Sequence, residues 1–229
     1  MLDAPLFSNL SFYRETPMKL SKKIAQLALV LGALPVAALA GDMGTVYTQI
    51  GTNGLGVGYA ASVSEDWAVR GQFNTLKQSF SGDIGDFGSG SSLDVKIDFN
   101  SLQLVGDWYP MGEGFRVSGG AVFNNNKITV NGTGKVGSDT VTTHTVNAEI
   151  KMSEGVAPYL GIGYSTKPKV AKGLGFNFDL GVMFQNPKAT LTAPTAPAAD
   201  VAAEQAQMQD AVDKLKYMPV LALGISYSF

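Results

Sequence analysis

His144 is the first residue to test for chemistry, because it is the single histidine of the chain and stands near Ser138 and Asp139. A histidine base, a hydroxyl nucleophile and a carboxylate that orients the base are the parts of nucleophilic catalysis. Nothing in the sequence orients these three side chains toward one another. The chain also lacks cysteine and a second histidine, which leaves no ligand set for a zinc site. The sequence therefore predicts no enzyme, no cofactor and no metal site.

A second set of charged residues lies at alternate positions of segments that read as strands. Arg70 and Arg116, the two arginines that follow residue 40, both fall on the polar face of their segments. The other charged residues predicted on such a face, all candidates to line the lumen of a barrel, are Asp98, Glu149, Lys151 and Asp179.

Two interpretations of this polar set stay open. In the first, the side chains pair with one another and fill the interior of a closed sheet. In the second, they line a narrow polar path that selects small charged solutes. Eight strands leave an interior only just wide enough for side chains, so geometry favours the first interpretation.

The strand that ends the chain shows the underlying pattern most clearly. From Leu221 to Phe229 the odd positions are all apolar and the even positions are small or polar. Successive side chains of a strand point to opposite faces, so one face is apolar and the other polar. Tyr227 and the terminal Phe229 resemble the C-terminal signal of outer-membrane barrels. We therefore expect the barrel-assembly machinery and outer-membrane lipid to be partners of this chain.

The same alternation recurs along the chain, with bulky apolar side chains on one face and glycine or polar side chains on the other. In a membrane barrel the first face contacts lipid and the second lines the lumen. Short connections alternate with long ones, which is typical of periplasmic turns and extracellular loops. The predicted fold class is therefore all-β: an eight-stranded antiparallel transmembrane β-barrel with short periplasmic turns and long extracellular loops. The expected strands are residues 43–51, 54–63, 67–81, 92–109, 115–131, 146–165, 174–192 and 215–229.

Three local features are expected within this barrel. The apolar positions of residues 92–109 change from odd to even, which predicts a β-bulge near Asn100. Residues 200–215, where Val201, Met208 and Leu215 stand seven apart, form either a short amphipathic helix or a mobile surface loop. Aromatic residues near the short-turn end predict a periplasmic girdle made of Trp67, Asp107-Trp108-Tyr109, Tyr227 and Phe229.

The first 40 residues are expected to be absent from the mature barrel. Residues 18–40 have a basic start, an apolar stretch and an Ala38-Leu39-Ala40 end, the pattern of a cleavable signal peptide. Residues 1–17 precede Met18 and read as an upstream mis-start. Residues 41–229 then form the outer-membrane β-barrel of a Gram-negative cell.

The composition of residues 41–229 agrees with this interpretation. Residues 1–40 hold four basic and two acidic side chains, which leaves 13 basic and 17 acidic ones and a net charge of −4. This charge is too small and too scattered to favour nucleic acid as a partner. The whole chain has a mean hydropathy of +0.09, and after residue 40 it has no further long apolar run, which suits strands that are apolar on one face.

Four segments of the chain are distinctive: Gly51-Thr52-Asn53-Gly54-Leu55-Gly56, Val156-Ala157-Pro158-Tyr159-Leu160-Gly161-Ile162-Gly163-Tyr164, Asn186-Pro187-Lys188-Ala189-Thr190-Leu191-Thr192 and Tyr217-Met218-Pro219-Val220. They resemble the CarO-like outer-membrane proteins, a family of small barrels. The resemblance implies an eight-stranded barrel associated with uptake of basic amino acids such as ornithine and with carbapenem susceptibility. It carries over no binding residue.

Three functional hypotheses follow. The first is a narrow channel or uptake protein for small polar solutes, with basic amino acids suggested by the resemblance and Asp98, Glu149 and Asp179 as its acidic lumen residues. The alternative is a non-conducting structural or surface-interaction barrel whose function lies in the extracellular loops 81–91, 132–146 and 193–214. An enzyme that uses His144 is the third and weakest.

Overall fold

The computed structural model describes residues 44–83, 92–111, 114–134, 144–153, 155–165 and 173–229. The chain divides into the units Met1–Ala40 and Gly41–Phe229, and all the described residues belong to the second. The predicted signal peptide and the residues Ser138 and Asp139 lie outside the described residues.

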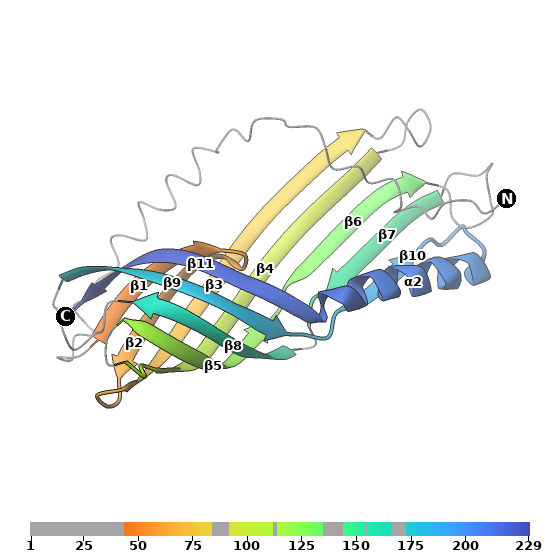
Figure 1. Ribbon diagram of the computed structural model, residues 1–229. Coiled ribbons are helices and arrows are strands. Elements are labelled where there is room, and N and C mark those ends of the chain that lie inside the picture. The colour runs from red at the N-terminus through yellow and green to blue at the C-terminus, as the bar shows by residue number, and fades with distance from the viewer. Residues whose placement is uncertain (1–43, 84–91, 112–113, 135–143, 154, 166–172) are drawn as a thin grey trace. The chain divides into compact units, whose positions relative to one another are not determined.

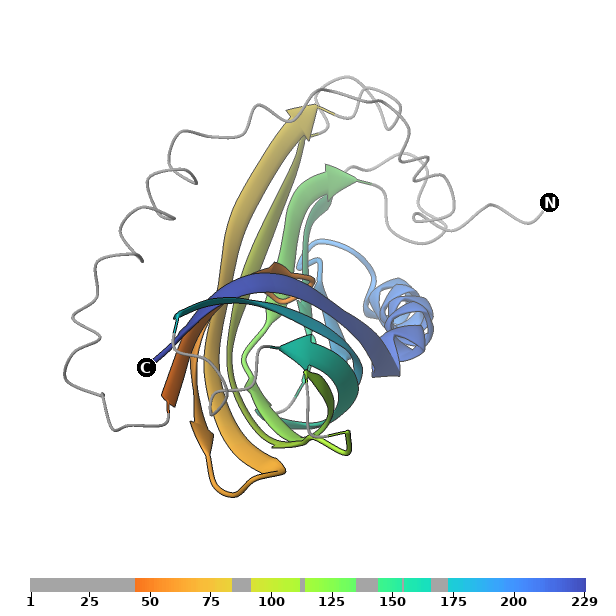
Figure 2. The same cartoon turned by 60° about the vertical axis from the view of Figure 1, so that its left-hand side comes forward.

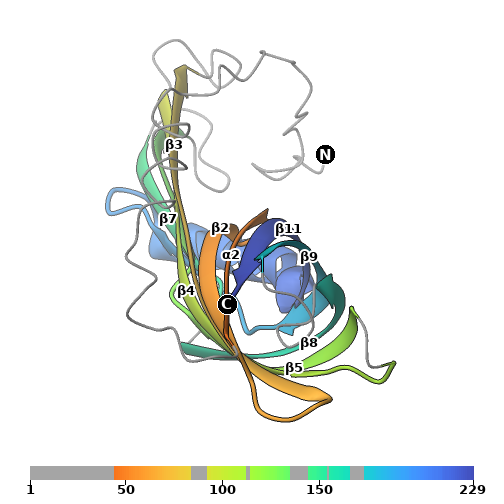
Figure 3. The same ribbon diagram turned by 90° about the vertical axis from the view of Figure 1, so that its left-hand side faces the viewer.

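Eight antiparallel strands close into a barrel, as the sequence predicted (Figure 1). The sheet closes because β1 pairs with β11 and β4 pairs with β5, and Figure 3 shows the ring of strands nearly end-on. The barrel strands are β1 (Gly44–Gly51), β2 (Gly54–Ser62), β3 (Trp67–Asp83), β4 (Ser92–Trp108), β5 (Phe115–Asn124), β8 (Gly155–Ser165), β9 (Gly173–Phe184) and β11 (Tyr217–Ser228).

Within the barrel the bulky apolar side chains point outward. On β11, Leu221, Leu223 and Ile225 are exposed while Val220, Ala222 and Ser226 are buried. Most barrel strands have 8 to 12 residues, which suits the roughly 9–11 residues that a tilted strand needs to cross a bilayer. The exposed belt therefore has the height and the chemistry of a lipid-facing surface. Its other members include Val69, Phe73, Leu102, Leu104, Val117, Phe123, Leu160, Ile162, Phe176 and Leu180.

Three further strands continue the sheet beyond the barrel. They are β6 (Lys127–Gly134), β7 (His144–Lys151) and β10 (Lys188–Thr192). β6 pairs with the part of β4 that lies beyond β5, β7 pairs with β6, and β10 pairs with β7. We call β6, β7 and β10, together with residues 75–83 of β3 and 92–100 of β4, the sheet extension (Figure 2). The predicted strands 115–131, 146–165 and 174–192 are therefore each divided into a barrel strand and an extension strand.

The two faces of the sheet exchange their polarity where the barrel passes into the extension. On β4, Leu102 and Leu104 are exposed on the outer face, whereas Phe99 of the extension is buried on the inner face. The β3–β4 register nevertheless runs without interruption from Trp67↔Trp108 to Asp83↔Ser92. The predicted β-bulge near Asn100 is therefore wrong. The apolar pattern changes phase because the outer surroundings change from lipid to water, and not because a residue is inserted.

An inserted residue does occur, but between β7 and β8. β5 pairs with β8 up to Asn124↔Gly155, and β6 pairs with β7 from Lys127↔Lys151 onward. Three residues of one strand therefore stand opposite two of the other, which is the count of a β-bulge. The extra residue exchanges the two faces of the strand, so that the side chains of β7 point to the opposite sides from those expected by continuing the alternation of β8.

Helix α2 (Ala198–Val212) packs on the inner face of the extension, beyond the barrel end that is opposite the C-terminus (Figures 1 and 2). Met208 and Val212 are buried against Ala148, Ala189 and Leu191. The short 3-10 helix η4 (Asp213–Lys216) then leads into β11. The structure thus contains the helix alternative for residues 200–215, with Val201 and Met208 against the sheet. Leu215 is 43% exposed, and Val212 is the residue of this segment that is buried against the sheet instead.

Two glutamines of α2 cover the free edge of β10. The side-chain oxygen of Gln205 accepts the N–H of Leu191 at 3.2 Å, and that of Gln209 accepts the N–H of Ala189 at 2.8 Å. Gln209 Nε2 also donates to the carbonyl of Pro187 at 3.0 Å. Gln209 therefore bonds to the strand edge as a further strand would, which protects an edge that is otherwise open to pairing with another chain.

Aromatic side chains gather at the short-turn end of the barrel. Trp67 and Trp108 are cross-strand partners with ring centroids 6.3 Å apart, and Tyr227 and Phe229 lie 5.2 Å apart. Tyr109 does not belong to this girdle. Its side chain is buried and its hydroxyl lies 3.2 Å from Ser165 Oγ inside the barrel.

We predict that Gln209→Leu loosens the extension while the barrel stays intact. The substitution leaves the Ala189 N–H and the Pro187 carbonyl without this partner, at a cost of about 1–3 kcal/mol for such groups when they are buried. Hydrogen exchange of residues 188–192 should become about tenfold faster or more. Gln207→Leu, on the exposed face of α2, is the matched control. Equal exchange in both variants would contradict the edge-covering role.

Candidate functional site

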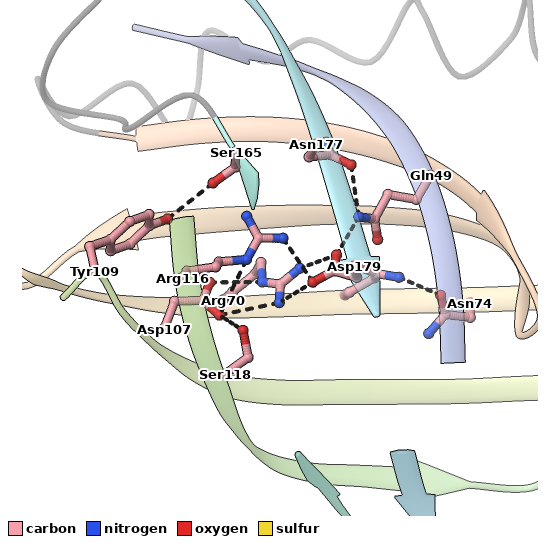
Figure 4. A network of polar contacts seen from close by, with 11 residues as sticks. Gln49, Arg70, Asn74, Asp107, Tyr109, Arg116, Ser118, Ser165, Asn177 and Asp179 are labelled. Carbon is pink, nitrogen blue, oxygen red and sulfur yellow. Dashed lines mark hydrogen bonds and ion pairs between the residues drawn. The ribbon is translucent and has the colours of Figure 1, made fainter. Parts of the chain in front are cut away.

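Four charged side chains meet inside the barrel, each from a different strand (Figure 4). Arg70 comes from β3, Asp107 from β4, Arg116 from β5 and Asp179 from β9. Each lies on the inner face because its neighbours in the strand direct bulky apolar groups outward. We call these four residues the charge network.

Asp179 is the centre of the charge network. Its Oδ2 accepts from Arg70 Nη1 at 2.9 Å, and its Oδ1 accepts from Arg116 Nη2 at 2.8 Å. Gln49 of β1 donates to the same carboxylate at 2.6 Å and to Asn177 Oδ1 at 2.7 Å. The carboxylate on β9 thus bonds to side chains from three other strands, β1, β3 and β5.

Asp107 is the second acid of the network. Arg70 Nε lies 2.9 Å from its Oδ2 and Arg116 Nε 3.7 Å from its Oδ1. The hydroxyl of Ser118 also donates to Asp107 Oδ1, at 2.6 Å. Sequence reasoning placed Asp107 only in the aromatic girdle. Its odd position, opposite in parity to Leu102 and Leu104, was the available signal for the inner face.

The network is electrically balanced and shielded from solvent. All four side chains are at most 5% exposed, and two positive charges face two negative ones. Tyr47 adds an aromatic face 5.7 Å from the Arg70 guanidinium carbon. Buried ions are stable only when each has partners that replace water. Here every ion has an opposite charge beside it, while Arg70 Nε, Asp107 Oδ2 and Arg116 Nε make no hydrogen bond.

Bulky side chains fill the interior on both sides of the network. Tyr159 lies over Gly161 and Gly181, and Tyr47 lies over Gly58. The contacts are so close that a Cβ atom at any of these glycines would collide with a tyrosine ring. The cavities beside the network have volumes of about 20 and 10 Å³. Each has room for roughly one water molecule. The described interior is therefore a packed polar core.

The other three predicted lumen residues lie on the outer face of the extension. Asp98 is near Lys77, at 3.9 Å, and Glu149 is near Lys151, at 3.5 Å, and all four are solvent-accessible. Asp98 faces outward because β4 has no bulge at Asn100. Glu149 and Lys151 face outward because the insertion between β7 and β8 reverses the sides of β7. The structure thus corrects their predicted place, whereas it places Arg70, Arg116 and Asp179 inside the barrel.

The hypothesis of an enzyme gains no geometric support. His144 begins β7 and pairs with Gly134, while Ser138 and Asp139 lie outside the described residues. Within the described ranges, no three side chains of the metal-binding types are grouped to hold an ion.

The closed sheet, the apolar belt and the polar interior define a β-barrel of the outer-membrane type. The belt places it in the lipid of a Gram-negative outer membrane. By the usual orientation of such barrels, the end with the C-terminus and the short turns is periplasmic, and the extension with α2 is extracellular. Among the described residues, no helix has both the length and the apolar character needed to cross a membrane.

Comparison with solved structures finds the same fold. The chain is similar to CarO of Acinetobacter baumannii, with a TM-score of 0.57, 22% identity and coverage of 82% of this chain and 98% of that one. CarO2 of the same organism has a TM-score of 0.57, 19% identity and the same coverage. No family model matches the sequence, and no curated protein matches it. The resemblance to CarO-like barrels is thus confirmed at the level of the fold.

We predict that Asp179→Asn strongly destabilises the barrel. Arg70 and Arg116 then share a single carboxylate, and loss of one partner from a buried ion pair costs about 3–5 kcal/mol. Urea unfolding in phospholipid vesicles, followed by tryptophan fluorescence, measures the change. Asp98→Asn is the control, because an exposed pair contributes about 1 kcal/mol or less. Equal effects of the two substitutions would contradict the central role of Asp179.

Proposed function

We propose that this protein is a closed, non-conducting outer-membrane barrel that presents the sheet extension and α2 at the cell surface. The observation that carries the proposal is the charge network, which joins four strands across the interior with all its ions paired. This is the alternative function that the sequence left open.

The size of the interior supports a closed state. Ligand sites in proteins have volumes of about 300 Å³ or more, whereas the cavities beside the network have about 20 and 10 Å³. A solute of amino-acid size therefore has to displace the arginines and their carboxylates before it passes. Displacement of one member leaves the buried network with one uncompensated charge, which is energetically unfavourable.

The extension has the construction of a folded surface unit. Its inner face buries apolar side chains under α2, and its outer face is polar. The glutamines of α2 bond to the β10 edge. A surface with this much internal structure suits recognition of a partner. Residues 193–214, one of the three predicted extracellular loops, contain the whole of its covering helix α2.

A narrow channel for small polar solutes is the second candidate. It is favoured by the charges themselves. Well-packed apolar side chains in the same space often give equal or greater stability than buried ion pairs, so stability alone does not explain why two arginines and two aspartates stand there. In such a channel Asp107 and Asp179 would attract a basic amino acid, because Asp98 and Glu149 lie on the outer face. Transport then requires that the charge network opens.

Planar-bilayer conductance separates the two candidates. We expect the protein purified from outer membranes to show no discrete openings, with or without ornithine. A variant with Arg70, Asp107, Arg116 and Asp179 all replaced by serine removes the ions and much of the filling volume. It should produce openings and so demonstrate that the assay detects a pore. Discrete openings of the unaltered protein that ornithine modifies would support the channel and contradict the closed barrel.

A further inference from the structure

A row of lysines crosses the outer face of the extension. The register places Lys77, Asp98, Lys127, Lys151 and Lys188 directly beside one another on five neighbouring strands. The row holds four lysines and one aspartate in a chain whose acidic residues outnumber its basic ones. We call it the lysine row.

The lysine row lies just above the lipid-facing belt. Phe73, Phe123 and Phe184 are exposed members of the belt, and each is followed four residues later by a lysine of the row. Four residues extend about 13 Å along a strand, which a tilt of about 40° reduces to roughly 10 Å along the membrane normal. Lysine side chains can also bend toward the membrane surface. Their ammonium groups therefore reach the level of the lipid headgroups.

A five-residue pattern builds this arrangement three times. A phenylalanine faces lipid, the next residue is an inward amide, the third is an outward polar residue and the fifth is the lysine. Asn74, Asn124 and Gln185 are the amides, and all three are buried at the rim of the barrel. The repeats are Phe73-Asn74-Thr75-Leu76-Lys77, Phe123-Asn124-Asn125-Asn126-Lys127 and Phe184-Gln185-Asn186-Pro187-Lys188. The pattern thus sets the height of a positive charge relative to the lipid.

The row is electrostatically unfavourable by itself. Lys127 stands directly opposite Lys151, and Lys151 directly opposite Lys188. Like charges in such cross-strand positions repel one another. Carboxylates compensate in part, because Asp98 lies 3.9 Å from Lys77 and Glu149 lies 3.5 Å from Lys151. The next row outward holds Lys96 and Glu149 with Thr129 between them, and the row after it holds Asp94. Five lysines and three carboxylates on these rows leave the surface positive.

We propose that the lysine row binds the phosphate groups of phosphorylated glycolipids in the outer leaflet. Lysine is a strong ligand for phosphate as a point charge, and an anionic lipid surface attracts basic residues at its own level. The phosphates relieve the repulsion within the row and hold the extension against the membrane surface. This site is independent of the charge network, so it stands whether the barrel is closed or conducting.

Native mass spectrometry of the detergent-solubilised protein tests the site. The probes are diphosphoryl lipid A, the same lipid after dephosphorylation, and inorganic pyrophosphate. Lys127→Gln with Lys151→Gln should weaken binding of diphosphoryl lipid A about tenfold or more and leave the dephosphorylated lipid unaffected. Lys214→Gln with Lys216→Gln removes the same number of charges from η4 and should change nothing. Lys127→Arg with Lys151→Arg should preserve binding.

A stability measurement excludes misfolding as the cause. In neutral detergent without lipid A, the Lys127→Gln and Lys151→Gln protein should unfold at the same temperature as the unaltered one or at a higher one, because repulsion is removed. Addition of diphosphoryl lipid A should raise the unfolding temperature of the unaltered protein more. Equal binding of phosphorylated and dephosphorylated lipid would overturn the proposal, as would unchanged binding by the glutamine variant. Full competition by pyrophosphate would identify a soluble anion as the ligand instead of the lipid and would also overturn it.

Discussion

The boundary between lipid and water governs the arrangement of this protein. Inside the membrane the outer face of the sheet must be apolar, because lipid offers no partner for polar groups. Beyond the membrane the same face meets water, and the apolar side chains turn inward under α2. β4 makes this change within one unbroken strand, from exposed Leu102 to buried Phe99. Both the polar interior of the barrel and the apolar core of the extension follow from it.

The polar interior then needs internal partners. The barrel is too narrow to hold much water, so the inward side chains have to satisfy one another. Asp179 and Asp107 neutralise Arg70 and Arg116, while tyrosines lying over glycines occupy the remaining space. The result is an interior whose strands are held together by charge. That is a reason to regard the barrel as a rigid support for what it carries outside.

The extension solves two further problems of an exposed sheet. Its last strand would leave a free edge, and Gln205 and Gln209 occupy that edge. Its outer face carries a row of lysines that repel one another at headgroup height. An anionic membrane surface turns this repulsion into attraction. The covered edge keeps the extension from pairing with another chain, and the lysine row holds the extension against the membrane surface.

The sequence alone determined the fold class, because alternation from Leu221 to Phe229 and in the other strands is a local property of the chain. It also determined that Arg70, Arg116 and Asp179 face away from lipid, since each lies in a strand with an uninterrupted alternation. Only the tertiary structure decided the sides of Asp98, Glu149 and Lys151. A single inserted residue reverses every later side chain of a strand, and the insertion lies between β7 and β8 instead of near Asn100. Likewise, the meeting of Asp179 with Arg70, 109 residues earlier in the chain, depends on the closure of β1 against β11, a contact that no local pattern contains.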